Sequence, residues 1–220
     1  GGYIGTQLMT VLQKRGHEGA GLDAGFFNDG WLYGVPVQNH IQRMDTREEK
    51  LIERLRGYDA CIHLGELSND PLGMFNPEIT YEINHCASVR LARLCKQAGI
   101  PRFVYSSSCS VYGVGNDDFK TEQSEVNPQT PYAECKVMVE RDVSALADED
   151  FSPVFLRNAT AYGPSPRMRF DIVLNNLAGL AWTTQEIRMT SDGTPWRPLV
   201  HVLDIAEATA VALGNGASGV

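Results

Sequence analysis

Residues 1–5 read Gly1-Gly2-Tyr3-Ile4-Gly5, and this glycine-rich stretch decides the fold that the sequence predicts. Apolar residues then recur at helical spacing from Ile4 onward, and the pattern stops at Gly16. Residues 18–23 are typical of a short strand that ends in an acid, Asp23. Turn, helix, strand and acid follow one another as in a dinucleotide-binding unit, where a carboxylate ~20 residues past the turn meets the adenosine ribose.

The remaining pattern alternates helices and strands, with polar loops between them. It predicts helices at 46–55, 78–98, 131–146, 172–181 and from 204 on, strands at 58–64, 102–106, 153–157, 186–189 and 199–202, and loops or turns at 24–42, 66–77 and 107–129. Regular alternation of this kind predicts an α/β fold built on a doubly wound parallel sheet, with ligands at the carboxyl ends of the strands.

Composition narrows the class of protein. The 220 residues are 43% hydrophobic and 21% charged, enough for one large core, and the net charge of -8 argues against a nucleic-acid partner. No apolar run approaches the ~20 residues that span a bilayer, so no membrane segment is expected. The five cysteines are an odd number without a Cys-x-x-Cys pair, which favours free thiols in the cytoplasm over disulfides or a metal site.

The stretch Thr130-Pro131-Tyr132-Ala133-Glu134-Cys135-Lys136 carries a candidate for proton transfer. Pro131 is suited to open a helix, on which Tyr132 and Lys136 lie four residues apart on one face. A nearby ammonium favours the phenolate, so the tyrosine could exchange a proton with an alcohol. An amphipathic helix also produces such pairs by chance, and the pair needs support from the rest of the chain.

Together these motifs resemble the extended short-chain dehydrogenase/reductase superfamily, in its branch of NAD-dependent epimerases and dehydratases. The resemblance runs from Gly2-Tyr3-Ile4-Gly5 through Ser106-Ser107-Ser108-Cys109-Ser110-Val111-Tyr112-Gly113 to Val200-His201-Val202-Leu203-Asp204-Ile205-Ala206. It implies a Rossmann-type fold, NAD as cofactor and a nucleotide-sugar as substrate, and we expect a homodimer.

The resemblance also implies a division of the chain. An NAD-binding Rossmann domain is expected at 1–158, joined again by 199–220, with part of a small substrate-binding lobe at 159–198. In the family a strand precedes the glycine turn and further lobe sequence follows. The sequence is therefore expected to be a fragment with an incomplete lobe.

Cofactor residues carry over by position. Gly2 and Gly5, with Tyr3 and Ile4 between them, match the family's pyrophosphate turn. Asp23 matches the ribose acid, and because no arginine follows it, NAD is favoured over NADP.

Three further positions match cofactor or active-site positions of the family. Asp45 matches the acid that reads the adenine amino group, although a helix cap in front of 47–49 explains it equally well. Leu64 lies at a strand end that faces the cofactor, and Asn84 matches a helix asparagine near the active site or is an ordinary polar position.

The resemblance assigns catalytic roles to Ser108, Tyr132 and Lys136. Ser108 lies 24 residues before Tyr132 and would hydrogen-bond the reacting oxygen. Tyr132 would shuttle its proton, while Lys136 would hold the nicotinamide ribose and favour the phenolate. Relatives that eliminate water carry Asp-Glu after the catalytic hydroxyl, where this chain has Cys109 and Ser110, so dehydration is not expected.

The substrate side matches the family less completely. Arg197 takes the place of the arginine that pairs with the diphosphate, followed by Pro198 instead of the usual aspartate. Thr160 replaces an asparagine, while Asn176 and Ser110 are assigned to the same substrate site.

Other polar residues are expected to be structural. His63, His201 and Asp204 are interpreted as such. Cys109 is one residue away from the cysteine place of C3 and C5 epimerases and is not expected to be catalytic. Glu66 is the most unusual residue, because the family has a small residue there; it is an extra acid at the substrate or points into solvent, and we favour solvent.

The functional expectation is an NAD-dependent sugar-nucleotide epimerase or 4-ketoreductase. Two alternatives remain open. One is a reductase of a ketone or aldehyde that carries no nucleotide. The other is a non-catalytic NAD-sensing or RNA-binding module on the same fold.

Overall fold

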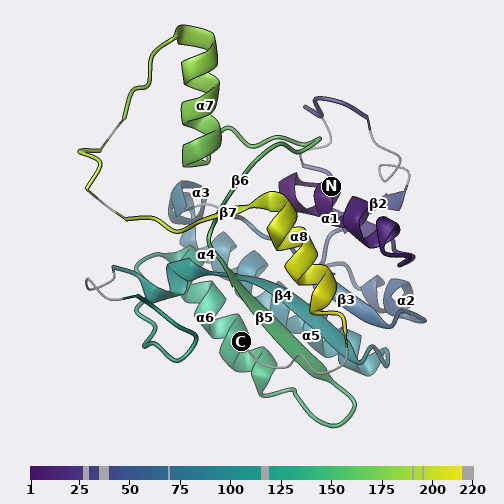
Figure 1. Ribbon diagram of the computed structural model, residues 1–220. Coiled ribbons are helices and arrows are strands. Elements are labelled where there is room, and N and C mark those ends of the chain that lie inside the picture. Colours follow the sequence, from purple (N-terminus) through teal and green to yellow (C-terminus); the bar gives the residue numbers. More distant parts are fainter. Residues whose placement is uncertain are drawn as a thin grey trace. The chain divides into compact units, whose positions relative to one another are not determined.

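The computed structural model describes residues 1–26, 30–34, 40–68, 70–114, 119–189, 191–194 and 196–214. They form two compact units, one made of residues 1–43 and 159–210, the other of residues 44–158 and the chain from 211 on. Both units contain parallel strands and helices (Figure 1), so the predicted α/β class is confirmed.

The first unit is built on two parallel strand pairs. The strands β1 (Gly21–Asp23) and β2 (Ile41–Arg43) pair with Asp23 opposite Arg43. The strands β6 (Thr160–Tyr162) and β7 (Leu199–His201) pair with Thr160 opposite Leu199. Its helices are α1 (Tyr3–Lys14), α7 (Val173–Thr184) and α8 (Val202–Val211).

Helix α1 is tied to the loop that follows β6. The Tyr3 hydroxyl donates to the Gly163 carbonyl at 2.7 Å, and the Thr6 and Ser165 hydroxyls lie 2.9 Å apart. Asn175 accepts a hydrogen bond from the Gly163 nitrogen at 3.0 Å. These contacts hold the helix that begins at the glycine turn in a fixed position within its unit.

The second unit carries a three-stranded parallel sheet in the order β3-β4-β5. The strands are β3 (Ala60–His63), β4 (Arg102–Ser108) and β5 (Ser152–Asn158). The register sets Ala60 beside Arg102, and Ser108 beside Asn158. β4 is therefore the central strand, and its serine-rich end lies at the carboxyl edge of the sheet.

The helices of this unit are α2 (Leu51–Leu55), α3 (Asp70–Phe75), α4 (Pro77–Thr80), α5 (Ala87–Gln97) and α6 (Pro131–Ser144). A π-helical turn, η2 (Tyr81–Cys86), joins α4 to α5, and a 3₁₀ turn, η3 (Cys109–Tyr112), follows β4. The largest fully buried side chains of the core include Phe103, Tyr105, Phe151, Phe155, Val139 and Val143. The apolar faces of β4, β5 and α6 therefore meet in one core.

Several predicted boundaries were wrong. Residues 186–189 do not form a strand, and α2 begins at Leu51 instead of residue 46. The last residues of the stretch predicted as a loop at 24–42 belong to strand β2. The predicted turn at 66–77 contains α3, and the predicted helix at 78–98 is interrupted by η2. Period alone cannot distinguish a π-helical turn from an α-helix, because one wider turn leaves the apolar face nearly unchanged.

Candidate active site

The glycine turn presents free backbone donors at the start of α1. Gly2 is the N-cap residue in an extended conformation, no side chain caps the helix, and its first turn holds no acid. The first amides of a helix lack partners within the helix, and the helix dipole favours an anion there. This end of α1 therefore fits the pyrophosphate of a dinucleotide.

Asp23 lies beside the same turn. Its Oδ2 is 3.0 Å from the Gly1 nitrogen, and its Oδ1 accepts a hydrogen bond from the Gly25 nitrogen at 2.7 Å. A Cβ atom on Gly1 would come within 3.1 Å of Oδ2, so a larger residue there would crowd the carboxylate of Asp23. The residues present fit a dinucleotide, with the acid next to the phosphate-binding backbone as a ribose requires.

Asp45, in the second unit, is bound to Arg47. Its Oδ1 accepts from the backbone nitrogen and Nε of Arg47 at 2.9 and 3.0 Å, and its Oδ2 accepts from Nη2 at 2.8 Å. The side-chain hydrogen bonds of Arg47 are the main reason that the pKa of Asp45 is lowered. Asp45 does not cap α2, which begins six residues later, and its role at adenine stays a prediction.

Ser108 ends β4 with its hydroxyl oxygen already engaged. The backbone nitrogen of Ser110 donates to Ser108 Oγ at 3.2 Å, so this oxygen acts as acceptor and caps η3. Because a hydroxyl both accepts and donates, Ser108 can still donate a hydrogen bond to a substrate oxygen. Ser110 Oγ is buried and has no hydrogen-bond partner among the described residues. The Ser108 hydroxyl thus keeps a donor for a bound alcohol or ketone.

Tyr132 stands in the first turn of α6. The turn is fixed by Thr130, whose side chain accepts a hydrogen bond from the Ala133 nitrogen at 3.2 Å, and by Pro131 at the first helical position. Lys136 follows one turn later, and its Nζ lies 5.3 Å from the centroid of the Tyr132 ring. The phenol and the ammonium therefore share one helical face, as the spacing predicts.

The Lys136 ammonium is buried. Nζ donates to the Ser106 carbonyl at 2.5 Å, lies 2.5 Å from Glu66 Oε2, and sits 4.5 Å from the centroid of the Tyr105 ring. Burial is the largest influence and lowers the pKa of Lys136. The electrostatic interactions with Glu66 and then with Tyr132 raise it and together exceed the effect of burial. The pKa of Lys136 is raised as a result.

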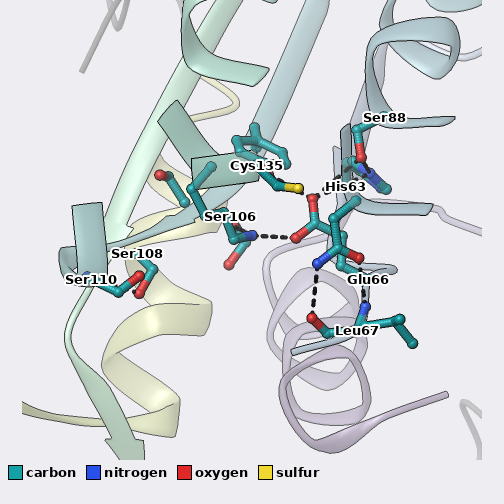
Figure 2. A network of polar contacts seen from close by, with 12 residues as sticks. His63, Glu66, Leu67, Ser88, Ser106, Ser108, Ser110 and Cys135 are labelled. Carbon is teal, nitrogen blue, oxygen red and sulfur yellow. Dashed lines mark hydrogen bonds and ion pairs between the residues drawn. The ribbon is translucent and has the colours of Figure 1, made fainter. Parts of the chain in front are cut away.

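Glu66 does not point into solvent, and the orientation that we favoured from the sequence was wrong. Its side chain is 3% exposed, and Figure 2 shows its carboxylate among Ser106, Ser88 and His63. The Tyr105 hydroxyl donates to Glu66 Oε1 at 2.6 Å, and the Ser88 hydroxyl donates to the same atom at 3.2 Å. A carboxylate can be buried when its oxygens meet donors and a cation, and here the sheet and helices supply all of them.

Asn84 fixes the loop that carries Glu66. It lies buried in η2, its Oδ1 accepts a hydrogen bond from the Leu67 nitrogen, and its Nδ2 donates one to the Leu67 carbonyl, both at 2.9 Å. Both ends of the amide are engaged by the backbone next to Glu66. Leu64 is half-buried directly after β3. Contact of Leu64 and Asn84 with a cofactor stays a prediction.

The histidines that we interpreted as structural have structural partners. His63 is buried, with Nε2 2.7 Å from the Ser88 hydroxyl, and burial lowers its pKa to about 4. His201 Nδ1 accepts a hydrogen bond from the Leu203 nitrogen at 3.2 Å at the start of α8, and its ring meets the Tyr162 ring edge-on. Asp204 lies exposed in the first turn of α8, where an acid stabilises the helix N-terminus.

The predicted substrate residues lie in the first unit, except Ser110. Thr160 opens β6, and its backbone nitrogen donates to the Pro198 carbonyl at 3.1 Å. Asn176 is exposed on α7 and donates to the Phe170 carbonyl at 3.0 Å. Arg197 is exposed, and no ion pair within the described part of the chain involves it. No hydrogen bond between described residues joins these three side chains.

Sequence reasoning missed the partners that bury Glu66 and Lys136 together. Tyr105 and Ser88 come from β4 and α5, far from Glu66 in the chain. The signal that was present was the acid itself, at a position where a small residue was expected. Within the described ranges, no group of three His, Cys, Asp or Glu could hold a metal ion, and no helix there is long and apolar enough to cross a membrane.

Gly113 closes η3 in a backbone conformation that favours glycine, with φ of 65°. A Cβ there would come within 1.9 Å of the Asn127 carbonyl oxygen, which belongs to the backbone and cannot rotate away. We expect Gly113→Ala to lower the free energy of unfolding by about 2–4 kcal/mol, measured by chemical denaturation. Gly99→Ala is the matched control, because Gly99 has a similar φ of 80° but open space around it, and it should cost only about 1–2 kcal/mol. Equal losses in the two variants would contradict the predicted clash.

Known proteins resemble the chain over nearly its whole length. The model of the "NAD dependent epimerase/dehydratase family" matches residues 1–220. UDP-glucose 4-epimerase of Azospirillum brasilense is 27% identical, over 96% of this chain and 66% of that protein. UDP-glucose 4-epimerase 2 of Arabidopsis thaliana is 29% identical, over 96% of this chain and 69% of that protein. The chain thus spans about two thirds of these relatives.

Solved structures give the same result. MoeE5 in complex with UDP-glucose and NAD superposes with a TM-score of 0.85 at 28% identity, over 99% of this chain and 71% of that one. The UDP-glucose 4-epimerase of Thermus thermophilus, in complex with NAD, gives a TM-score of 0.82 at 25% identity, over 99% of this chain and 73% of that one. These matches confirm the predicted Rossmann-type α/β fold.

Proposed function

Since the chain belongs to the NAD dependent epimerase/dehydratase family, we propose that it is the larger part of an NAD-dependent enzyme that acts on a nucleotide-sugar. The enzyme would oxidise a hydroxyl of the sugar to a ketone and then reduce that ketone again. The observation that carries the proposal is the placement of Tyr132 and Lys136 on one face of α6, with the ammonium 5.3 Å from the phenol ring. Such a pair serves a reaction that moves a proton to and from an alcohol.

The cofactor's pyrophosphate and adenosine ribose would be held by residues of the first unit. The free amides at Gly2, Tyr3 and Ile4 would bind the pyrophosphate, and Asp23 the ribose. The Tyr3 side chain itself is engaged with Gly163, so only its backbone serves the cofactor. NAD supplies a hydride acceptor beside the sugar when it is bound.

The chain's own groups would handle the proton. The Ser108 hydroxyl donates a hydrogen bond to the reacting oxygen and keeps its proton, and the Tyr132 phenolate oxygen takes the proton from the sugar hydroxyl. Lys136 stabilises the phenolate that starts the reaction. Ser110, with its unpartnered hydroxyl, orients a neighbouring hydroxyl of the substrate. Neither Cys109 nor Ser110 is the acid or base that elimination of water needs, so the enzyme would leave the sugar's oxygen content unchanged.

Epimerisation and net reduction differ in their products. The full-length protein incubated with NAD and a panel of UDP-sugars would give a mixture of C4 epimers if it is an epimerase. UDP-sugars come first in the panel because the matched relatives are UDP-glucose 4-epimerases. Consumption of NADH with a 4-keto sugar and no epimer would assign a reductase. Absence of hydride transfer across the panel would favour the non-catalytic NAD-sensing role.

Arg197 tests whether the substrate carries a diphosphate. It is exposed in the first unit, and a guanidinium can bind a phosphate group through two parallel N–H···O hydrogen bonds. We expect Arg197→Ala to raise KM for the nucleotide-sugar about tenfold or more while kcat changes little, since a remote contact binds ground and transition states alike. Arg188→Ala, on an arginine paired with Glu186, is the control. An unchanged KM would favour a substrate without a nucleotide.

Three remaining parts of the proposal rest on the sequence. They are the homodimer, the cytoplasmic location and the division into a cofactor domain at 1–158 with 199–220 and a substrate lobe at 159–198. Light scattering of the purified full-length protein tests the dimer. Limited proteolysis with and without NAD tests the division, because bound cofactor should protect the first region more than the lobe.

A further inference from the structure

The site contains a buried charge that its proposed chemistry does not use. Glu66 follows β3, where the sequence resemblance predicts a small residue, and both its side chain and that of Lys136 are almost completely buried, at 3% and 6% exposure. The two charged groups lie 2.5 Å apart. An isolated ammonium in such a place would be expelled or lose its proton.

We propose that Glu66 is a positioning residue that keeps Lys136 protonated and in place beside Tyr132, so that the enzyme works in alkaline as well as neutral solution. The proposal rests on the proposed function for its catalytic part. The geometry that supports it is a pair of buried contacts to one nitrogen. Glu66 Oε2 and the Ser106 carbonyl both lie 2.5 Å from Lys136 Nζ.

The two contacts to the ammonium differ in kind. Nζ donates a hydrogen bond to the Ser106 carbonyl and forms an ion pair with the Glu66 carboxylate, whose Oε2 has no hydrogen-bond partner among the described residues. Lys136 is thus held in place by groups of the protein itself before a ligand arrives.

Glu66 is in turn held by its own donors. Tyr105 and Ser88 donate to its Oε1, and the Asn84 amide clamps the backbone of the next residue, Leu67. Burial, and then the charge of Glu66, raise the pKa of the Tyr105 phenol well above its ordinary value, so this group stays a donor. The carboxylate therefore has one orientation, with Oε2 directed at Lys136.

The charged and titratable groups around the pair come from four elements. They are His63 on β3, Tyr105 on β4, Glu66 in the loop after β3, and Tyr132, Cys135 and Lys136 on α6. His63 is neutral at working pH, because burial lowers its pKa to about 4, and burial likewise raises the pKa of Cys135 to about 12. Glu66 is therefore the carboxylate among these groups that pairs with Lys136.

The pair makes a signed prediction for pH. Burial works to lower the pKa of Lys136, and Glu66 reverses this effect, so the folded pKa lies above the ordinary value. The contribution of protonated Lys136 to the free energy of unfolding is then fully present below the ordinary lysine pKa. It is lost only as the pH rises through the raised pKa of Lys136 in the folded protein. Without Glu66, burial is the dominant influence, so the pKa of Lys136 in the folded protein falls below its ordinary value. The free energy of unfolding should then rise with pH across the alkaline range.

The first experiment is the pH profile of kcat for Glu66→Gln in the full-length protein. The wild type should hold its kcat to about pH 9, while the variant should lose activity on the basic side at a pH lower by about one unit or more. Tyr105→Phe is the matched control, because it removes a hydrogen bond to Glu66 and leaves the charge. It should lower kcat without moving the basic limb. A variant Glu66→Gln with uniformly lower kcat and an unmoved limb would overturn the proposal.

The second experiment needs no substrate and separates this inference from the proposed function. Chemical unfolding of the wild type and Glu66→Gln between about pH 7 and 10 should show the stability gap narrowing as pH rises. A constant gap would mean that Glu66 only fills space. An enzyme inactive on every nucleotide-sugar would sink the proposed function and leave this readout intact.

A double variant covers failure to fold. If Glu66→Gln does not fold, Glu66→Gln/Lys136→Met decides the cause. Recovery of the fold would identify the uncompensated Lys136 charge as the fault and support the proposal. A double variant that stays unfolded would show that Glu66 acts through packing alone.

Discussion

Replacing Tyr132 by Phe should abolish turnover and leave NAD binding intact. The variant removes the atom through which α6 would accept the substrate proton, and loss of a positioned acid–base group costs about 10²–10⁴-fold in kcat. The ring stays in place, because Thr130 and Pro131 still fix the first turn of the helix. The measurements are kcat on the nucleotide-sugar and the Kd for NAD from calorimetry.

A tyrosine outside the proposed proton path provides the control. Tyr81 donates a hydrogen bond to Glu134, which also lies on α6 but two positions beyond Tyr132 and so on a different face. Tyr81→Phe should keep kcat within a few-fold of the wild type. Full activity of Tyr132→Phe would sink the assignment of the proton shuttle, and loss of NAD binding would show that the tyrosine acts on the cofactor.

The second large effect is on stability, at Arg157. Its guanidinium holds Glu140 in a fork, with Nη2 to Oε2 at 2.7 Å and Nε to Oε1 at 3.1 Å, and both side chains are nearly buried. The Ser107 hydroxyl is a further donor to Glu140. Arg157→Met would leave this carboxylate buried without its cation. We expect a loss of about 3 kcal/mol in the free energy of unfolding, and a melting temperature lower by roughly 6–12 °C.

The double variant Arg157→Met/Glu140→Met is the decisive comparison. Replacing both charges with apolar groups removes the unpaired carboxylate, so most of the loss should be recovered. Additive losses would mean that the two residues do not act as a pair. Arg157 Nη1 also donates to the Tyr112 hydroxyl at 3.0 Å, so the single variant should loosen the turn after Ser108 and reduce kcat as well.

Local patterns predicted much of the site. The helix of Tyr132 and Lys136, the strand end of Ser108 and the acid at Asp23 each depend on a few neighbouring residues, and the structure has all of them where they were expected. The elements that were wrong are short or irregular. α2 spans five residues, β2 three, and the π-helical turn keeps the apolar face of the helix around it. Short elements are stabilised by contacts with the rest of the fold, which a local pattern does not contain.

Glu66 shows most clearly what a local sequence pattern cannot predict. As a lone acid after a strand, it has no sequence neighbour that could hold its charge, and exposure to water was the reasonable expectation. Its partners Ser88, Tyr105 and Lys136 come from α5, β4 and α6, all far along the chain. A buried carboxylate and a buried ammonium are each costly alone and tolerable together, so neither burial could be predicted without the other.

The sequence by itself determined the order of most helices and strands and the parallel α/β class, because these follow from periodicity and spacing along the chain. It also predicted, by spacing and by resemblance to the family, which residues could move a proton or bind a dinucleotide. The tertiary structure alone decided the electrostatics of the site. It placed Glu66 against Lys136, engaged Asn84 with the Leu67 backbone, and left the hydroxyl of Ser110 without a partner among the described residues. The reason is physical: a charge or a hydrogen bond in a protein interior is fixed by what surrounds it in space, and those surroundings are assembled from distant parts of the chain.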